Sequence, residues 1–210
     1  MNTHDARIAI IYYSSTGNMH RIAEAFAEGA ADAGAEVRLR RVAELAPAEA
    51  VDANPAWRAH LDATAHVPEA GHADLTWADG YAFGTPTRFG NMASQLRQFL
   101  DTTASLWEAG ELADKPATGF TGSYEHHGGQ ESTLLSLYHT MYHWGALVLP
   151  TGYVDYDAVH AAGGNPYGVS QTEALAAEDP AHAKAVLVAA RSQGGRLARA
   201  AAALAAAHGR

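Results

Sequence analysis

The sequence of 210 residues contains no cysteine. Disulfide bonds, a thiol nucleophile and any metal or iron–sulfur centre held by cysteine are therefore excluded. Basic residues are also scarce, because 14 Lys and Arg stand against 23 Asp and Glu, and the net charge is −9. No extended run of basic residues offsets this balance. The charge argues against a protein that binds the phosphate backbone of a nucleic acid.

Long apolar segments are missing as well. No apolar run approaches the roughly 18 residues that a membrane-spanning helix needs. The first 14 residues, MNTHDARIAIIYYS, contain an acidic residue and too short an apolar stretch for a signal peptide. We therefore expect a cytoplasmic protein with no membrane partner. The length suits one well-filled core, so we expect a single domain over residues 1–210.

Strands and helices alternate in the hydrophobic pattern. Residues 7–14 are a continuous β-branched and aromatic run, typical of a strand buried on both faces. In residues 36–42, apolar residues alternate with arginines. This pattern is typical of an edge strand with one face exposed to solvent. We expect strands at 7–14, 36–42, 79–86, 116–123 and 146–153, and helices at 18–33, 91–104, 130–144 and 181–207. This alternation predicts an α/β fold, a doubly wound five-stranded parallel sheet in the order 2-1-3-4-5 with helices on both faces.

Two long segments show no regular spacing of apolar residues that would predict a helix or a strand. Residues 44–74 contain three prolines and predict loop with at most one short helix, and residues 153–179 are rich in Gly, Pro and Asp. Long ordered loops are often functional, but variable surface is an equal alternative. In the last helix, Gly194-Gly195 predicts a kink or a close backbone approach, because glycine is costly in a helix interior.

A hydroxyl-rich loop, SSTGN (14–18), follows the first strand and opens the first helix. Such a loop presents unpaired backbone N–H groups and the positive end of the helix dipole. With the side-chain donors of its Ser, Thr and Asn residues, it can hold a phosphate dianion without a cationic side chain. The alternative is an ordinary helix cap made by Thr16 or Asn18. Neither G-x-G-x-x-G nor G-x-x-x-x-G-K-[ST] occurs here, which argues against those dinucleotide and NTP domains.

Two further loops follow the third and fourth strands. They are GTPTRFGNM (84–92) and TGSYEHHGGQES (121–132). In the predicted order, strands 1, 3 and 4 are neighbours, and ligands of doubly wound sheets bind beyond their carboxyl ends. We therefore expect one site, in which the first loop holds a phosphate and the other two hold a flat head group.

The loop SSTGN resembles the phosphate loop of flavodoxins, and FGTPTRFGNMASQLRQFLD (83–101) resembles the WrbA family of NAD(P)H:quinone oxidoreductases. The resemblance continues through LWEAGEL (106–112), GGQES (128–132), HWGALVLPTGY (143–153) and GGNPYG (163–168), and covers nearly the whole chain. It implies a flavodoxin-like, FMN-dependent homotetramer that reduces quinones by two electrons at the expense of NADH or NADPH. The flavin carries the chemistry, so no catalytic side chain is expected.

The resemblance also assigns site residues by matching positions. It implies that the FMN phosphate lies on the first loop, that the isoalloxazine lies against the second and third, and that Trp107 lies on the substrate side. The implied FMN contacts are Ser14, Ser15, Thr16, Gly17, Asn18, Met19, Pro86, Thr87, Arg88, Phe89, Gly90, Gly122, Ser123, Tyr124, Glu125, Gly128 and His143. Trp107 is either an aromatic wall, reaching the flavin of a neighbouring subunit, or an anchor for its own loop.

Some positions depart from the family pattern. Thr16 stands where the family commonly has Tyr, a contact to the nicotinamide cofactor, and the third loop has a bulkier rim of Glu125, His126 and His127.

His139 and His143 share a helix face but lack the Glu of H-E-x-x-H and a third ligand, so no metal is expected. The alternatives to an enzyme are an electron-carrier flavodoxin and a flavin-binding regulatory protein. The extra length at 102–114 and 153–179 favours the enzyme.

Overall fold

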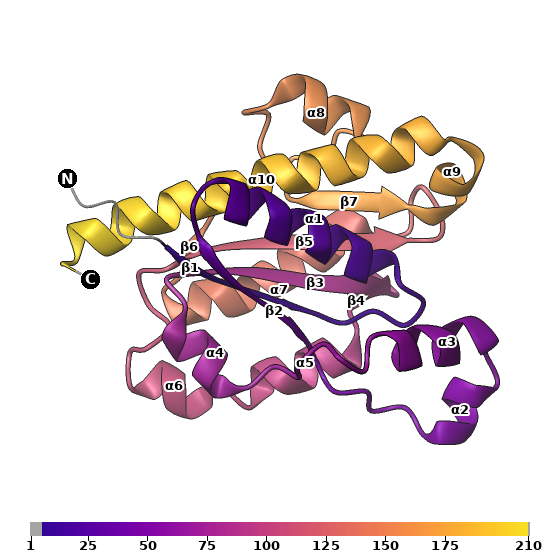
Figure 1. Ribbon diagram of the computed structural model, residues 1–210, viewed down its shortest axis with the longest axis horizontal. Coiled ribbons are helices and arrows are strands. Elements are labelled where there is room, and N and C mark those ends of the chain that lie inside the picture. The colour runs from indigo at the N-terminus through magenta and orange to yellow at the C-terminus, as the bar shows by residue number, and fades with distance from the viewer. Residues whose placement is uncertain (1–5, 210) are drawn as a thin grey trace.

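The computed structural model describes residues 6–209 (Figure 1). Its strands are β1 (Arg7–Tyr12), β2 (Glu36–Arg41), β3 (Gly80–Arg88), β4 (Asn91–Met92), β5 (Pro116–Ser123), β6 (Leu147–Val148) and β7 (Val169–Thr172). Its helices are α1 (Asn18–Asp32), α2 (Ala48–Asp52), α3 (Pro55–Ala63), α4 (His72–Trp77), α5 (Ser94–Asp101), α6 (Ala104–Glu108), α7 (Gln130–Trp144), α8 (Tyr156–Ala161), α9 (Glu173–Glu178) and α10 (Pro180–Ala207). Within this described range, no helix combines the length and the apolar character that crossing a bilayer requires.

The sheet has the order β2-β1-β3-β5-β6, and these strands run parallel. The predicted fold class and the order 2-1-3-4-5 are confirmed, with β2 at the edge. The fifth position, however, is filled by two strands. Leu147 of β6 pairs with Pro116 at the start of β5, and Val169 of β7 pairs with Phe120 in its second half.

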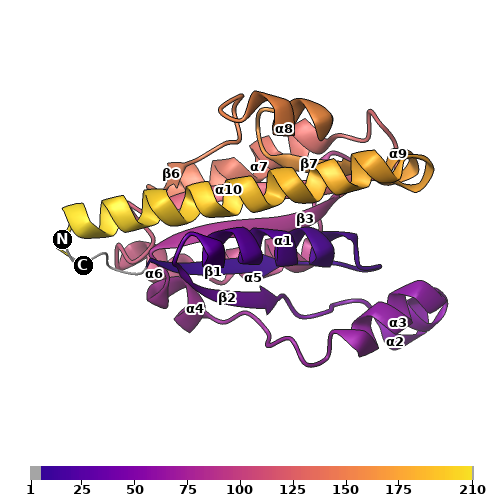
Figure 2. The ribbon, with the colours of Figure 1, turned by 45° about the horizontal axis from the view of Figure 1, so that its top comes forward.

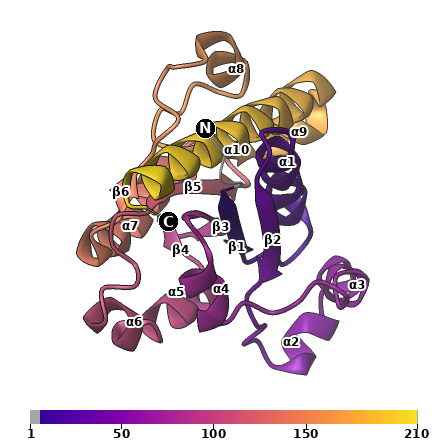
Figure 3. The ribbon, with the colours of Figure 1, turned by 60° about the vertical axis from the view of Figure 1, so that its left-hand side comes forward.

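The strand predicted at 146–153 is therefore wrong beyond its first residues. After Leu149 donates its N–H to Ala117, the chain reaches Pro150, which has no N–H to continue the ladder. The chain then leaves the sheet, forms α8 on the outer side of α10, and returns as β7 (Figure 3). The predicted loop 153–179 thus contains α8, β7 and α9.

Helices cover both faces of the sheet (Figures 1 and 2). Successive residues of β1 face opposite sides, as the period of a strand requires. Ile8 and Ile10 pack with α1 and α10, whereas Ala9 and Ile11 pack with α5 and α7. Both apolar layers are buried, which explains why β1 reads as a continuous apolar run.

Helices α1 and α10 approach closely through glycines. A Cβ at Gly29 would collide with the backbone carbonyl of Arg191, and one at Gly194 would collide with that of Phe26. Gly195 faces the carbonyl of Gly29. The close backbone approach predicted at Gly194-Gly195 is confirmed.

Other boundaries differ from the sequence predictions. Residues 44–74 contain two short helices, α2 and α3, and the start of a third, α4. Helix α3 begins with Pro55 after Asn54, whose side chain accepts from the N–H groups of Ala56 and Trp57. The single helix predicted at 91–104 is divided. Its first residues form β4, which pairs antiparallel with the end of β3, and only then do α5 and α6 follow.

Candidate functional site

The first loop leaves the start of α1 without a capping side chain. Among the described residues, the N-cap is Gly17, with φ 103°, and neither Thr16 nor Asn18 caps the helix. The N–H of Gly17 donates to the Ser14 hydroxyl at 3.0 Å, which closes the loop into a tight turn. The N–H groups of the first helical turn therefore remain for an anion, as a phosphate-binding loop requires.

The second loop is the turn of a hairpin between β3 and β4. Phe89 and Gly90 have φ of 52° and 77°, the left-handed values of a two-residue hairpin turn. This conformation costs a residue with a Cβ about 1–2 kcal/mol, and the Phe89 side chain is fully exposed. Arg88 points back to the first loop, with its Nη2 3.5 Å from the Ser15 hydroxyl.

The third loop packs against the second. The hydroxyls of Thr87 and Thr133 lie 2.7 Å apart, and Thr87 also donates to the carbonyl of Gly128 at 3.4 Å. Ser132 donates to the carbonyl of Gly90 at 3.0 Å. The three loops predicted to form one site therefore do meet at the carboxyl edge of the sheet.

One buried polar atom in this region has no partner. The side-chain Nε2 of Gln130 donates to Thr172 at 3.2 Å, but its Oε1 is buried with no hydrogen bond in the part of the chain described. Such groups are rare and commonly mark a ligand or water position. An uncapped helix start, an exposed aromatic turn and an unsatisfied amide oxygen, all at one edge, fit a phosphorylated planar cofactor such as FMN.

Not every predicted residue presents its side chain to this edge. Met19 is 2% exposed and lies beneath Gly122, so only its backbone is available to a ligand. Pro86 and Ser123 are also buried, and Ser123 donates to the carbonyl of Glu125 at 2.5 Å. Thr16, Tyr124 and Glu125 are exposed, whereas Gln130 and Thr133 join the site without having been singled out from the sequence. Gln130 lies in the GGQES string (128–132), in which only Gly128 was assigned, and Thr133 follows that string directly.

Trp107 and His143 lie at the other end of the molecule. Helix α7 starts at the third loop, and at 1.5 Å per residue its 13-residue run from Gln130 carries His143 about 20 Å away. The indole Nε1 of Trp107 donates to the carbonyl of His143 at 2.8 Å, yet Trp107 is 52% exposed. Helix α6 lies opposite to β4 and α3 in Figure 1. The structure therefore does not bring these two residues to the three loops of their own chain.

Titratable groups beneath the first loop are held in one state. Burial raises the pKa of Tyr12 and of Tyr13 well above the usual range. Burial acts to raise the pKa of Glu44, but hydrogen bonds from Ala46, Gln95, Tyr13 and Trp57 outweigh it and hold that pKa below its usual range. The phenols are neutral and Glu44 is charged at neutral pH.

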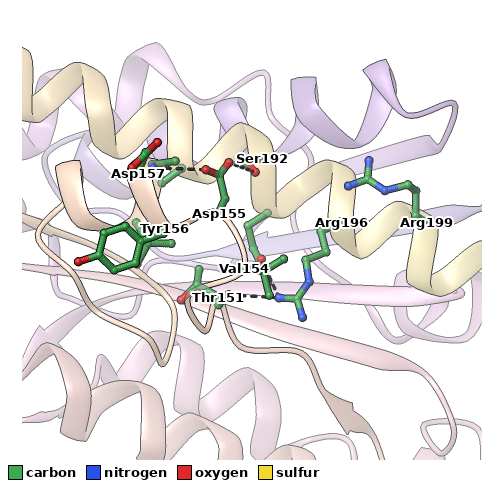
Figure 4. A pocket seen from close by; sticks show the side chains of 12 residues that line it. Thr151, Val154, Asp155, Tyr156, Asp157, Ser192, Arg196 and Arg199 are labelled. Carbon is green, nitrogen blue, oxygen red and sulfur yellow. Dashed lines mark hydrogen bonds between the residues drawn. The ribbon is translucent and has the colours of Figure 1, made fainter.

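A cavity of about 400 Å³ lies elsewhere, between α10 and the segment that carries α8 (Figure 4). Asp155 accepts from Ser192 at 3.0 Å across it, and Arg196 donates to the carbonyl of Pro150. It contains none of the predicted site residues. Among residues 6–209, no three His, Asp or Glu side chains gather in a way that could hold a metal ion.

Comparison with known proteins gives consistent findings. Residues 6–161 match the family described as NADPH-dependent FMN reductase. An NAD(P)H dehydrogenase (quinone) of Deinococcus radiodurans is 47% identical over 170 residues, which are 81% of this chain and 84% of that protein. One from Geotalea uraniireducens is 44% identical over 203 residues, covering 95% of this chain and 99% of the other.

Solved structures share the fold. The crystal structure of the flavodoxin, WrbA-like protein from Agrobacterium tumefaciens superimposes with a TM-score of 0.65 at 24% identity, over 95% of this chain and 99% of that one. A flavodoxin from the domain Archaea gives a TM-score of 0.58 at 15% identity, over 93% and 98%. At these identities the likeness concerns the fold alone.

Proposed function

Because the chain belongs to the NADPH-dependent FMN reductase family and is a relative of the NAD(P)H dehydrogenases (quinone), we propose that it is an FMN-dependent NAD(P)H:quinone oxidoreductase. The WrbA-like resemblance stated from the sequence is confirmed by these relatives. The observation that carries the proposal is the meeting of three loops at the carboxyl edge of the sheet, with the uncapped start of α1 among them.

Bound FMN would supply a ring that accepts hydride from a nicotinamide and passes electrons to a quinone. The protein's part is to bind and orient. The N–H groups of the first turn of α1, with the hydroxyls of Ser14 and Ser15, hold the phosphate. Thr87, Arg88 and the third loop hold the ring edge. Arg88, whose Nη2 lies 3.5 Å from the Ser15 hydroxyl, would also place a permanent positive charge beside the first loop.

The functional unit in this proposal is a homotetramer. Trp107 and His143 of one subunit approach the flavin of another, and Trp107 walls the quinone site. Exposed aromatic side chains support this arrangement, because Phe89 and Tyr124 are exposed at the loop end, and Trp107 and Tyr142 at the other. Apolar surface of this kind is typical of contact sites. A quinone stacked on an indole gains about 0.5–1.5 kcal/mol beyond its burial.

The first experiment measures turnover. FMN-loaded protein is assayed for oxidation of NADH and of NADPH, with and without benzoquinone. We expect quinone-dependent oxidation of at least one nicotinamide. If the loaded protein binds FMN but oxidises neither, the electron-carrier alternative replaces the enzyme.

A second experiment tests the cofactor. The apoprotein is titrated with FMN, riboflavin and FAD, with flavin fluorescence as the signal. We expect FMN to bind most tightly, because the first loop is built for one terminal phosphate and no second Gly-rich pyrophosphate turn follows a strand. Equal affinities for FMN and riboflavin would remove the phosphate assignment from this loop.

A further inference from the structure

Hydrogen bonds to Glu44 hold the segment that contains α2 and α3 (residues 48–63) next to the first loop. Glu44 accepts hydrogen bonds from the Tyr13 hydroxyl at 2.9 Å, from the Trp57 indole at 3.0 Å and from the Gln95 amide at 2.7 Å. These partners come from the end of β1, from α3 and from α5. Figure 2 shows α2 and α3 beyond the carboxyl end of β2, on the side where α1 begins. The segment is therefore docked at the phosphate end of the site.

This docking brings an imidazole against the loop. The Nδ1 of His60, on α3, lies 3.4 Å from the point that a Cβ on Gly17 would occupy. The ring centroids of His60 and His20 are 5.5 Å apart. His20 is held in turn by Tyr12, whose hydroxyl lies 2.6 Å from its Nδ1, and by Glu24, 3.3 Å from its Nε2. Both imidazoles are partly buried.

Any positive charge at the first loop comes from residues outside it. A phosphate monoester carries a charge of about −1.5 to −2 at pH 7, while the loop itself contains no Lys or Arg. Among the groups next to the loop, Arg88 lies 3.5 Å from the Ser15 hydroxyl and Arg21 is hydrogen-bonded to Asn18. We propose that His60, packed on Gly17 and backed by His20, is a further phosphate-recognition residue, which takes up a proton from solvent when the phosphate of FMN binds. This proposal rests on the proposed function, since it assumes that FMN occupies the loop.

The surrounding groups set the protonation of His60 before binding. Burial, and then the neighbouring His20, hold its pKa below the usual range, and Glu24 acts against them. Burial likewise lowers the pKa of His20, with Glu24 acting to raise it and His66 to lower it further. The charged and titratable groups around His60 are His20 and Glu24 of α1, Tyr12 of β1, Tyr13 directly after it, Arg41 of β2, Glu44, His66 and, across the loop, Arg88. The free protein therefore carries a neutral His60 at neutral pH.

A phosphate dianion beside the ring stabilises the imidazolium and raises the pKa of His60 in the complex. The complex then binds more protons than the free protein, so affinity for FMN rises as the pH falls through the bound-state pKa, and the gain is complete below the free-state pKa. Below pH about 6 the phosphate dianion of the ligand itself takes up a proton and becomes a monoanion, and the gain ends. Riboflavin, which has no phosphate, binds without this dependence.

The experiment measures Kd for FMN and for riboflavin across about pH 6 to 8.5 in the wild type, His60→Gln and His60→Lys. For the wild type we expect FMN to bind more tightly at pH 6.5 than at pH 8.5, and each pKa unit by which FMN raises the pKa of His60 can contribute up to about tenfold in affinity. His60→Gln should lose this dependence, and His60→Lys should bind FMN tightly throughout the range. His72→Gln, a change at an exposed imidazole on α4, is the matched control and should keep the wild-type profile.

Calorimetry in buffers of different ionisation enthalpy gives a second readout, the number of protons taken up with FMN. We expect uptake in the wild type that is absent in His60→Gln and absent with riboflavin. An unchanged pH profile and unchanged uptake in His60→Gln would overturn the role of His60 while leaving FMN binding intact. Failure of the wild type to prefer FMN over riboflavin at any pH would instead overturn the proposed function. Unchanged riboflavin affinity in the variants shows that they are folded.

Discussion

Single residues in the first loop differ in what they offer a phosphate. Thr16 is exposed and Ser15 is half-buried, and both adjoin the uncapped start of α1. Replacing Thr16 with Asp places a carboxylate where the phosphate dianion is expected, so FMN affinity should fall by at least about tenfold. Ser15→Ala removes one hydrogen bond and should cost about 1 kcal/mol. Titration with FMN checks both, and riboflavin affinity is the control. If Thr16→Asp binds FMN normally, the phosphate lies elsewhere.

Glu44 gives a prediction about acid stability. Its pKa is held below the usual range despite burial, so its contribution is present above the ordinary Glu pKa and is lost as the pH falls through the folded value. Glu44→Gln leaves Tyr13, Trp57 and Gln95 with a poorer acceptor and should cost about 1–3 kcal/mol at pH 7. Urea unfolding at pH about 7 and about 3.5 measures the effect.

The variant should also lose less stability than the wild type between the two pH values. Glu49→Gln, a change at an exposed position on α2, is the matched control. A variant as stable as the wild type at pH 7, with the same acid dependence, would show that the hydrogen bonds to Glu44 contribute nothing to folding.

The sequence located the three loops but missed residues that reach them from elsewhere. Each loop follows a strand, so strand prediction alone brings them to one edge. His60 lies in the segment 44–74, for which the sequence predicts mainly loop, and nothing local indicates that α3 folds back over Gly17, 43 positions earlier in the chain. Trp107 and His143 were identified by a matching string. Matching gives the identity of a contact but does not tell whether it comes from the same chain.

At the scale of whole elements, α1 and α10 give the sharpest test. Gly29 and Gly194 face backbone carbonyls so closely that no Cβ fits, whereas a Cβ at Gly195 would lie 3.1 Å from its nearest neighbour. Gly29→Ala and Gly194→Ala should each destabilise the protein by about 3 kcal/mol, because the helices must separate. Gly195→Ala should cost less, since alanine favours a helix by about 1 kcal/mol. Thermal unfolding measures all three. Equal effects at the three positions would contradict the packing seen here.

Long elements were predictable and short ones were not. The helix predicted at 130–144 matches α7, and β5 has its predicted bounds. Each of these elements is long enough to show a clear hydrophobic pattern in the sequence. The strands β4, β6 and β7 contain two to four residues, too few to show a period. β4 pairs with the last two residues of β3, which extend beyond β1 and β5, and β6 and β7 pair with the side of β5 that β3 does not cover. The segment between β6 and β7 was predicted as loop because its helix, α8, has only six residues and is also too short to show a hydrophobic pattern.

On the scale of the whole molecule, the residues assigned to the candidate site lie at two ends of one chain. The three loops lie at the carboxyl edge of the sheet, and the Trp107–His143 pair lies beyond its amino edge. One folded chain cannot bring the two together, because the length of α7 separates them. Activity in this proposal therefore depends on assembly, and the two halves of each complete site belong to different subunits.

That division makes a prediction that mixed oligomers can test. Trp107→Ala alone should raise the KM for quinone with little change in FMN affinity, because the loops are untouched. Thr16→Asp subunits bind FMN at least about tenfold more weakly but keep Trp107, so at limiting FMN the cofactor occupies the Trp107→Ala subunits. When subunits of the two variants are co-assembled, an FMN held by a Trp107→Ala subunit meets the intact indole of its neighbour, and part of the activity should return to the wild-type KM. Homo-oligomers of each variant, assayed at the same concentration, are the controls. Mixed oligomers that keep the high KM of Trp107→Ala would show that the indole serves its own chain, as the bond from Trp107 to the His143 carbonyl also permits.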